Sequence, residues 1–389
     1  MFGISEEEFV FLKLNENQRI LKENIDKDSK MLALKGINGT ICRQINALQK
    51  CKNKLPHFYK ALCVIPPISI EQASSIYTTN TKEHSGNRAL DLTCGLGGDS
   101  THFSKTFSKV ISIERETLLS EIAKYNFEKL NISNIELIND DAQNFLENYC
   151  GEKFDMIYCD PARRDEKRRT FLLEDCSPNI IEILPLIEKH TSKLVVKLSP
   201  LFDCNELEKI FSNYNITITV VSYDNECKEV LAELNFDKET QITRKCCVIK
   251  KDGTYKSYIF PTTFLTNDID ENSYNKYLYI ADVTFKKFKN TEELIAKYYP
   301  KIKAKISNNV IISDDLIENF AGRSYEIIDI LEQKQKALKK YFKANNIKSA
   351  TIIKEGTTKS IEEIRKSFGL RDGAQATLVI TAKQIFVVK

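Results

Sequence analysis

The stretch Asp91-Leu92-Thr93-Cys94-Gly95-Leu96-Gly97-Gly98-Asp99 joins a short aliphatic run, RALDL, to a segment with the composition of a helix. Glycines at a turn from a strand into a helix let backbone amides approach a ligand closely. The G-x-G-x-x-G pattern of dinucleotide sites is incomplete, because Ser100 stands where the third glycine would be. The same glycines would also suit a tight turn with only a structural role. We therefore expect a strand, a turn and a helix here, with a ligand other than a dinucleotide.

Short β-branched runs recur beyond Gly86, separated by stretches long enough for helices. Strands that alternate with helices predict a parallel, doubly wound sheet. The runs are RALDL, KVISIE, NIELI, FDMIYCD, KLVVKLS, ITITVVSY and KCCVIKK. The predicted fold class is therefore α/β, with a Rossmann-like, mostly parallel sheet.

Four segments follow from the change of pattern along the chain. Residues 1–86 are polar with helix-like apolar spacing and predict an N-terminal helical extension. Residues 87–252 hold the predicted sheet. Residues 253–317 predict a small α+β segment, for which a ferredoxin-like topology is one option, and residues 318–389 predict a basic α+β domain at the C-terminus.

Acidic residues stand at the predicted carboxyl ends of four strands. Asp91 suits an ammonium group and opposes a pyrophosphate. Glu114, about 20 residues beyond the glycines, can accept both ribose hydroxyls of an adenosine. Asp141 can accept from an adenine amino group, and Asp160 ends the fourth run. Since these strand ends line one crevice of an open sheet, the four acids predict a nucleoside-containing ligand. Glu114 and Asp141 would serve equally well as helix caps.

Residues 88–250 resemble class I S-adenosylmethionine methyltransferases. DLTCGLGGD resembles their first motif, and DPAR at 160–163 resembles their D/N-P-P-aromatic motif. Ala162 and Arg163 replace the second proline and the aromatic residue, so base stacking at this position is not implied. The resemblance implies S-adenosylmethionine as cofactor, bound by residues at the strand ends. These are Asp91, Thr93, Gly95, Gly97, Glu114, Arg115, Asp141 and Ala142.

Five short motifs are spread over most of the chain. They are K-L-P at 54–56, S-I-E-Q-A-S-S at 69–75, D-P-A-R-R at 160–164, K-L-S-P at 197–200 and N-E-C-K-E at 225–229. Together they resemble bacterial methyltransferases with a C-terminal THUMP-like domain. This narrower resemblance implies an RNA partner, rRNA or tRNA, because THUMP-related domains belong to RNA-modifying enzymes.

The fourth strand end carries the predicted catalytic residues. A sulfonium methyl group is already electrophilic, so the enzyme mainly has to align an acceptor lone pair with it. We expect Asp160 to hold an acceptor amine by hydrogen bonds and Pro161 to fix the turn beside it. Asp-Pro is also a common turn dipeptide, which is the structural alternative.

Basic and polar residues near this site are predicted to contact the substrate. Arg163 and Arg164 can clamp phosphates, with Lys167, Arg168 and Arg169 following them. Gln72 lies in a segment that could close over the cofactor as a lid. A solvated charged loop and a serine-capped helix are the alternatives.

Charge is distributed unevenly along the chain. Residues 333–389 contain 13 Lys and Arg against 4 Asp and Glu, a net charge of +9, whereas residues 1–332 carry −6. Such segregation suits a polyanion such as RNA, although solvated lysines on a helix give the same pattern. Four lysines have helical spacing on one face and are the predicted RNA contacts: Lys336, Lys339, Lys340 and Lys343.

Composition excludes several other classes. No apolar run reaches the roughly 18 residues that a membrane span needs, and the acidic N-terminus does not resemble a secretory signal. Neither the eleven cysteines nor the four histidines have metal-ligand spacing, so we expect no metal site and reduced, mostly buried thiols. Cys159 is a candidate nucleophile by position, but a cysteine at a strand end is more often buried packing. A cytoplasmic location without membrane attachment follows as an expectation, and the oligomeric state is left open.

Three functional hypotheses remain. The first is a methyltransferase acting on a base of structured RNA, at an exocyclic amine. The second is a non-catalytic RNA-binding or assembly protein that keeps the fold, which the missing aromatic residue favours. The third is a small-molecule methyltransferase, for which the basic C-terminal segment would be unnecessary.

Overall fold

The computed structural model describes residues 3–163, 172–261, 276–289, 291–300, 304–307 and 309–389. The chain divides into two compact units. One comprises residues up to Tyr223 together with Lys228–Thr243 and Lys251–Tyr255, and the other comprises Asp224–Cys227, Arg244–Lys250 and Lys256–Lys389. Each unit has its own hydrophobic clusters.

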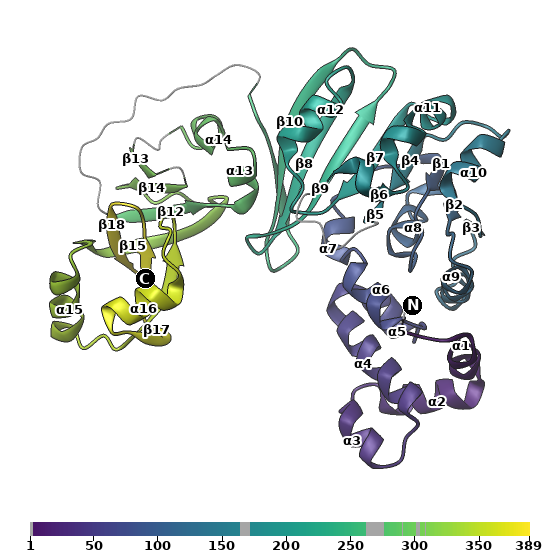
Figure 1. Cartoon of the computed structure of the whole chain (residues 1–389), viewed down its shortest axis with the longest axis horizontal. Helices are drawn as coiled ribbons and strands as arrows, with labels where there is room; N and C mark the ends of the chain where they lie inside the picture. Colours follow the sequence, from purple (N-terminus) through teal and green to yellow (C-terminus); the bar gives the residue numbers. More distant parts are fainter. Residues whose placement is uncertain (1–2, 164–171, 262–275, 290, 301–303, 308) are drawn as a thin grey trace. The chain divides into compact units, whose positions relative to one another are not determined.

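Seven helices precede the first strand, as the sequence predicts for the N-terminal extension. Figure 1 shows α1–α6 grouped together in the first unit. A capping box between Ser5 and Glu8 starts the first of them and satisfies backbone donors that would otherwise have no partner. The helices are α1 (Glu6–Lys13), α2 (Asn15–Asn24), α3 (Ser29–Leu34), α4 (Gly39–Lys54), α5 (Pro56–Lys60), α6 (Pro67–Gln72) and α7 (Ile76–Thr79).

The extension is fixed to the sheet domain through α9 (Thr117–Lys129). Ile122 of α9 belongs to the same buried cluster as Phe9 and Leu12 of α1. The side chain of Asn126, also on α9, accepts a hydrogen bond from the Val64 amide at 2.8 Å and donates one to the Val64 carbonyl at 2.8 Å. These bonds satisfy buried polar groups on both sides of the contact, so the extension packs on the sheet domain as an integral part of this unit.

A nine-stranded sheet is centred in the first unit, in the order β11-β10-β8-β9-β7-β4-β1-β2-β3. Strands β3, β2, β1, β4 and β7 run parallel, and β9 pairs with β7 antiparallel. The strands are β1 (Gly86–Asp91), β2 (Phe107–Ile113), β3 (Ile135–Ile138), β4 (Met156–Cys159), β7 (Lys193–Leu198), β8 (Asn215–Tyr223), β9 (Glu226–Asn235), β10 (Gln241–Ile249) and β11 (Tyr255–Ile259). The predicted fold class is confirmed. The strand β9 was not among the seven predicted runs, because its first residues, ECKE, are polar.

Helices connect the parallel strands of this sheet. They are α8 (Gly98–Phe103) after β1, α9 after β2, α10 (Ala142–Asn148) after β3, α11 (Ile180–His190) before β7 and α12 (Cys204–Ile210) after it. A short antiparallel pair, β5 (Ala162–Arg163) with β6 (Cys176–Ser177), and the 3-10 helix η1 (Leu173–Asp175) lie between β4 and α11. The carboxyl ends of β4, β1, β2 and β3 therefore follow one another along one edge of the sheet.

The second unit contains a seven-stranded sheet in the order β13-β14-β12-β15-β18-β17-β16. Its elements are β12 (Tyr277–Ala281), α13 (Val283–Lys287), α14 (Thr291–Tyr298), β13 (Ala304–Ser307), β14 (Val310–Ser313), β15 (Gly322–Glu332), α15 (Gln335–Ala344), β16 (Ser349–Lys354), α16 (Ile361–Phe368), β17 (Arg371–Ile380) and β18 (Gln384–Val388). Leu338 and Phe342 of α15 pack with Ile364 of α16 and with strand residues. Since β12 and β15 are neighbours, the boundary predicted at residue 317 falls between strands of one continuous sheet.

No helix in the described part of the chain is long and apolar enough to cross a membrane. None of the eleven cysteines is paired with another, and nine of them are buried.

Candidate active site

The glycine-rich loop after β1 adopts a conformation that depends on its glycines. Gly95 and Gly97 have φ values of 55° and 85°. A Cβ atom on Gly97 would lie 2.4 Å from the ring of Phe127, so no larger residue fits there without displacing α9. The shape of the loop is therefore determined by backbone geometry as well as by packing.

The buried side chain of Asp91 stabilises this loop by hydrogen bonds. Its carboxylate accepts hydrogen bonds from the Thr93 amide at 3.0 Å and from the Ser100 hydroxyl at 2.5 Å. The residue is 1% exposed, and burial raises the pKa of its carboxyl to about 7, against the opposing effect of these hydrogen bonds. The predicted contact of Asp91 with a cofactor ammonium stays a prediction.

Glu114, directly after β2, is tied to the same loop. Its carboxylate accepts from the Gly95 amide at 2.8 Å and from the Glu116 amide at 2.9 Å, one on each oxygen. Burial raises the pKa of this carboxyl, and the two amide hydrogen bonds partly oppose that effect. Each carboxylate oxygen keeps a further lone pair that can accept a hydroxyl group, so the residue fits the predicted ribose contact.

Asp141, after β3, serves as the cap of a helix, which is the structural alternative to a ligand contact. Its side chain caps α10 by accepting from the amides of Gln143 at 2.8 Å and Asn144 at 3.4 Å. Ala142 is the buried first residue of that helix. A cap does not exhaust the lone pairs of a carboxylate, so the predicted adenine contact of Asp141 and Ala142 remains a prediction.

Side-chain hydrogen bonds of Arg115 and Asn139 fix the segment after β2. The exposed Arg115 donates to the Ser177 hydroxyl at 2.9 Å. The amide group of Asn139, which no motif in the sequence singled out, donates to the carbonyls of Glu114 at 2.7 Å and Arg115 at 3.1 Å. This crosslink holds the two predicted adenosine-binding segments in register.

Asp160 lies beside the glycine-rich loop. Its amide donates to the Thr93 hydroxyl at 2.7 Å, which joins the loop after β4 to the loop after β1. The carboxylate forms an ion pair with Lys197, and its side chain is 33% exposed. Pro161 follows, and Ala162 pairs with Ser177 in the short β5–β6 ladder. The order of strands thus brings Asp160, Asp91 and Glu114 to the same edge of the sheet, as predicted.

Two predicted substrate contacts are described only in part. Arg163 lies in β5 and Gln72 ends α6, but the structure describes the backbone and not the side chain of each. Arg164 lies outside the described residues, as do Lys167, Arg168 and Arg169.

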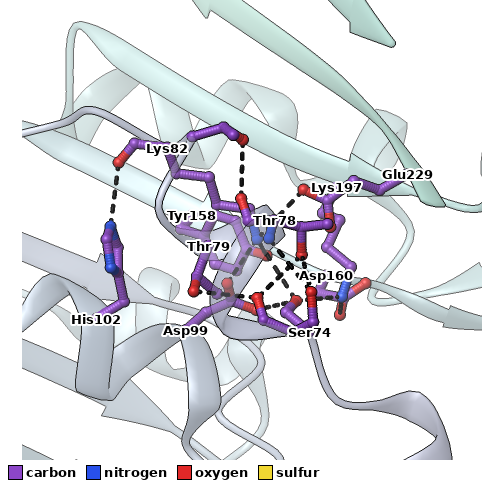
Figure 2. Close-up of polar contacts among 12 residues, drawn as sticks. Ser74, Thr78, Thr79, Lys82, Asp99, His102, Tyr158, Asp160, Lys197 and Glu229 are labelled. Carbon is purple, nitrogen blue, oxygen red and sulfur yellow. Dashed lines mark hydrogen bonds and ion pairs between the residues drawn. The ribbon is translucent and has the colours of Figure 1, made fainter. Parts of the chain in front are cut away.

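A buried charged network behind Asp160 was missed by sequence reasoning (Figure 2). Lys197 donates to the Ser74 hydroxyl at 2.9 Å, and that hydroxyl donates to Asp99 at 2.8 Å. Asp99 forms an ion pair with Lys82 at 2.5 Å, and Lys82 lies 3.7 Å from Glu229. We call Ser74, Lys82, Asp99, Asp160, Lys197 and Glu229 the charged network.

The charges of this network stabilise one another. Burial would lower the pKa of Lys197, but the carboxylates of Asp160, Asp99 and Glu229 outweigh burial and hold it above its usual range. Burial would raise the pKa of Asp99, but Lys82 and Lys197 outweigh burial and hold it well below its usual range. Burial dominates at Glu229 and raises its pKa. Lys197 and Asp99 are therefore charged across the physiological range of pH.

The sequence contained a signal for this network. Ser74, Asp99, Asp160, Lys197 and Glu229 lie respectively in SIEQASS, DLTCGLGGD, DPARR, KLSP and NECKE, each of which carries a family resemblance. The motifs gave no indication that their residues meet, because they are spread over more than 150 positions of the chain. Lys82 lies in none of them.

Two further sequence predictions concern Cys159 and the lysines of α15. Cys159 is fully buried, and burial raises the pKa of its thiol well above the ordinary value, so it is unsuited to act as a nucleophile. The lysines of the predicted RNA-binding face are all exposed on α15, on the side opposite the buried Leu338 and Phe342. They are Lys336, Lys339, Lys340 and Lys343.

Comparison with known proteins agrees with this architecture. Residues 83–254 match the family model of a methyltransferase domain, and residues 322–388 match that of a THUMP domain-like region. The chain therefore carries a methyltransferase domain and is an S-adenosylmethionine-dependent methyltransferase. Its cofactor is S-adenosylmethionine, and its C-terminal part is a THUMP-like domain. The enzyme hypothesis is therefore confirmed over that of a non-catalytic protein.

Three similar proteins illustrate the range of the match. A candidate methyltransferase from Porphyromonas gingivalis W83 has the same fold, with a TM-score of 0.81, 23% identity, and coverage of 100% of this chain and 99% of that one. A protein from Methanobrevibacter smithii assigned as a cobalt-precorrin-6B C(15)-methyltransferase (decarboxylating) is 27% identical over 168 residues, which are 42% of this chain and 82% of the relative. An uncharacterised RNA methyltransferase from Thermotoga maritima is 33% identical over 107 residues, 25% of this chain and 24% of that protein.

The raised pKa of Asp91 predicts a pH-dependent stability. The unfolded carboxyl ionises near 3.8 and the folded one near 7, so stability that is present below pH 3.8 is lost as the pH rises through about 7. Asp91→Asn keeps the shape of the group without this ionisation. We expect the melting temperature of the variant to gain on the wild type between about pH 4 and pH 7, measured by calorimetry. A difference that stays constant over this range would contradict a buried, titrating Asp91.

Proposed function

We propose that this methyltransferase modifies a nucleobase of structured RNA, such as rRNA or tRNA, at an exocyclic amine. The observation that carries the proposal is the position of Asp160, a partly exposed carboxylate joined through Thr93 to the glycine-rich loop. The basic THUMP-like domain and the similarity to an RNA methyltransferase support RNA as the partner. The similarity to a corrin methyltransferase favours the small-molecule alternative, for which the basic C-terminal segment would be unnecessary.

The residues present fit the cofactor. The backbone of the glycine-rich loop at Gly95 and Gly97 and the two carboxylate oxygens of Glu114 would hold its adenosine portion. Bound there, S-adenosylmethionine supplies an electrophilic methyl group on a sulfonium. Since the methyl group needs no further activation, the work of the protein is to place the acceptor.

Asp160 is the residue proposed to position the acceptor amine. Its carboxylate accepts a hydrogen bond from the acceptor amine and so keeps the nitrogen lone pair directed at the methyl group. With the cofactor bound, the nitrogen would form its bond to the methyl carbon as the carbon–sulfur bond breaks and S-adenosylhomocysteine is left. The carboxylate of Asp160 would stabilise the positive charge that develops on the nitrogen. The surplus proton then leaves the nitrogen to Asp160 or to water.

Binding of the cofactor product tests the first part of the proposal. Glu114→Ala removes the acceptor of the ribose hydroxyls, and we expect the affinity for S-adenosylhomocysteine to fall by about 1 to 3 kcal/mol. Calorimetry measures this loss. Glu116→Ala is the matched control, since the exposed Glu116 side chain pairs only with Arg115 among the described contacts. Equal affinities for the two variants would argue against the ribose contact.

A second variant separates binding from chemistry. Asp160→Asn should leave the affinity for S-adenosylhomocysteine nearly unchanged and lower methyl transfer to RNA by at least about 100-fold, because the carboxylate acts on the acceptor. Transfer is measured with radiolabelled S-adenosylmethionine and RNA from cells that lack the gene. Asp237→Asn, at an exposed turn, is the control. Loss of cofactor affinity in Asp160→Asn would make the residue structural, and full activity would remove its proposed role.

The lysine face of α15 tests the RNA partner. Reversing Lys336, Lys339, Lys340 and Lys343 to Glu should abolish RNA binding and flatten its dependence on salt, because fewer counterions are released from the phosphates. Cofactor affinity should not change. Filter binding at two salt concentrations measures the effect.

A matched variant controls for net charge in this experiment. It reverses four exposed lysines of the N-terminal extension, Lys22, Lys27, Lys30 and Lys35, and so changes the total charge equally. If both variants bind RNA as the wild type does, the lysine face is a solvated surface, and a small-molecule acceptor becomes the better proposal.

A further inference from the structure

The ammonium group of Lys197 uses two of its three N–H donors in hydrogen bonds within the described residues. The residue stands near the carboxyl end of β7, and its ammonium donates to Asp160 and to the Ser74 hydroxyl. An ammonium group has three N–H donors. Within the described residues the third one has no hydrogen-bonded acceptor, and the side chain is 12% exposed.

Asp160 offers the complementary group. Its Oδ2 atom pairs with Lys197, whereas its Oδ1 atom has no hydrogen-bonded donor in the described part of the chain. Among the described residues, an acceptor and a donor without partners therefore belong to one ion pair (Figure 2), whose two side chains are 33% and 12% exposed. Behind them, Ser74, Lys82, Asp99 and Glu229 are all buried.

Stability alone does not account for this arrangement. Burying charges costs free energy, and apolar residues of similar size are often as stable as a buried ion pair. Perturbed, buried charges that open into a site are instead typical of functional positions. Because the surrounding carboxylates hold the pKa of Lys197 high, its ammonium is a permanent donor and not a proton acceptor.

The chemistry that matches such a pair is a nucleobase edge with an N–H group beside a ring nitrogen or a carbonyl oxygen. The N–H group donates to Asp160 while the ring nitrogen or carbonyl accepts from the lysine. A phosphate or carboxylate lacks the donor and would be repelled by Asp160, and an aliphatic amine lacks the acceptor. A base offers both atoms in one plane, at neighbouring positions of its edge.

We propose that Lys197 is a specificity-determining residue that binds the acceptor atom adjacent to the methylated nitrogen, so that Asp160 and Lys197 together recognise the donor–acceptor edge of the target base. This inference rests on the proposed RNA function. Ser74, Asp99, Lys82 and Glu229 act through Lys197 by holding its ammonium at the site. They are positioning residues and do not touch the substrate.

The first experiment compares Lys197→Met and Lys197→Arg with the control Lys193→Met on the same strand. Methyl transfer is followed with radiolabelled S-adenosylmethionine and RNA from cells that lack the gene. We expect Lys197→Met to lower transfer by about 10- to 100-fold, the usual worth of one base contact. Lys197→Arg keeps a donor and should recover part of the loss. Lys193→Met should match the wild type, and the melting temperature and the affinity for S-adenosylhomocysteine monitor folding.

The second experiment separates a contact with the base from an indirect effect on Asp160. Once mass spectrometry has identified the methylated nucleoside, an oligoribonucleotide carries the analogue of that base in which C–H replaces the adjacent acceptor atom. If Lys197 binds that atom, the methyl-transfer rate of the wild type should fall on the analogue by about the same factor as the rate of Lys197→Met falls on the normal base. The rate of Lys197→Met should then fall little further when the analogue replaces the normal base. Lys197→Arg serves in the same cycle if Lys197→Met does not fold.

The outcomes distinguish this inference from the proposed function. The role of Lys197 is overturned if the effects of the variant and of the base analogue on methyl transfer are fully additive, or if Lys197→Met is as active as the wild type. Either result leaves the proposed RNA methylation standing. A wild-type protein that transfers no methyl group to any RNA overturns both.

Discussion

The ion pair between Lys82 and Asp99 is the interaction on which the rest of the site depends. Asp99 belongs to the glycine-rich segment, and its second oxygen accepts from Ser74, which in turn receives a donor from Lys197 beside Asp160. Removing either partner would leave a buried charge uncompensated, at a cost of about 3 to 5 kcal/mol. The loop after β1, the loop after β4 and the end of the N-terminal extension are therefore held together by electrostatics as much as by packing.

Much of the fold and part of the site could be predicted from the sequence, since both leave local patterns. Alternating runs predict parallel strands, and parallel strands bring their carboxyl ends together, which is why Glu114 and Asp160 could be placed near the glycine-rich loop from local patterns alone. Strand β9 was missed because its first residues are polar. One of them, Glu229, turns its carboxylate into the charged network. The network itself depends on contacts between distant residues, which no local pattern records.

Asp141 shows a different limit of sequence reasoning. A carboxylate at the end of a strand is equally a ligand for a base and a cap for the helix that follows, and the structure contains the cap. The two roles use different lone pairs of the same group, so the pattern could not choose between them. At Asp91 the prediction named an ammonium partner, while the structure shows internal hydrogen bonds that shape the loop. A residue type at a strand end predicts the neighbourhood of a ligand better than it predicts the atom contacted.

The contribution of Ser74 and Lys82 has a consequence for how such a protein can evolve. The methyltransferase match begins at residue 83, one position after Lys82 and nine after Ser74. A recombination event that moved the sheet without the preceding helices would leave Asp99 as a buried anion without Lys82, and would leave Lys197 without its hydroxyl partner. The helical extension and the sheet domain are thus a single heritable module.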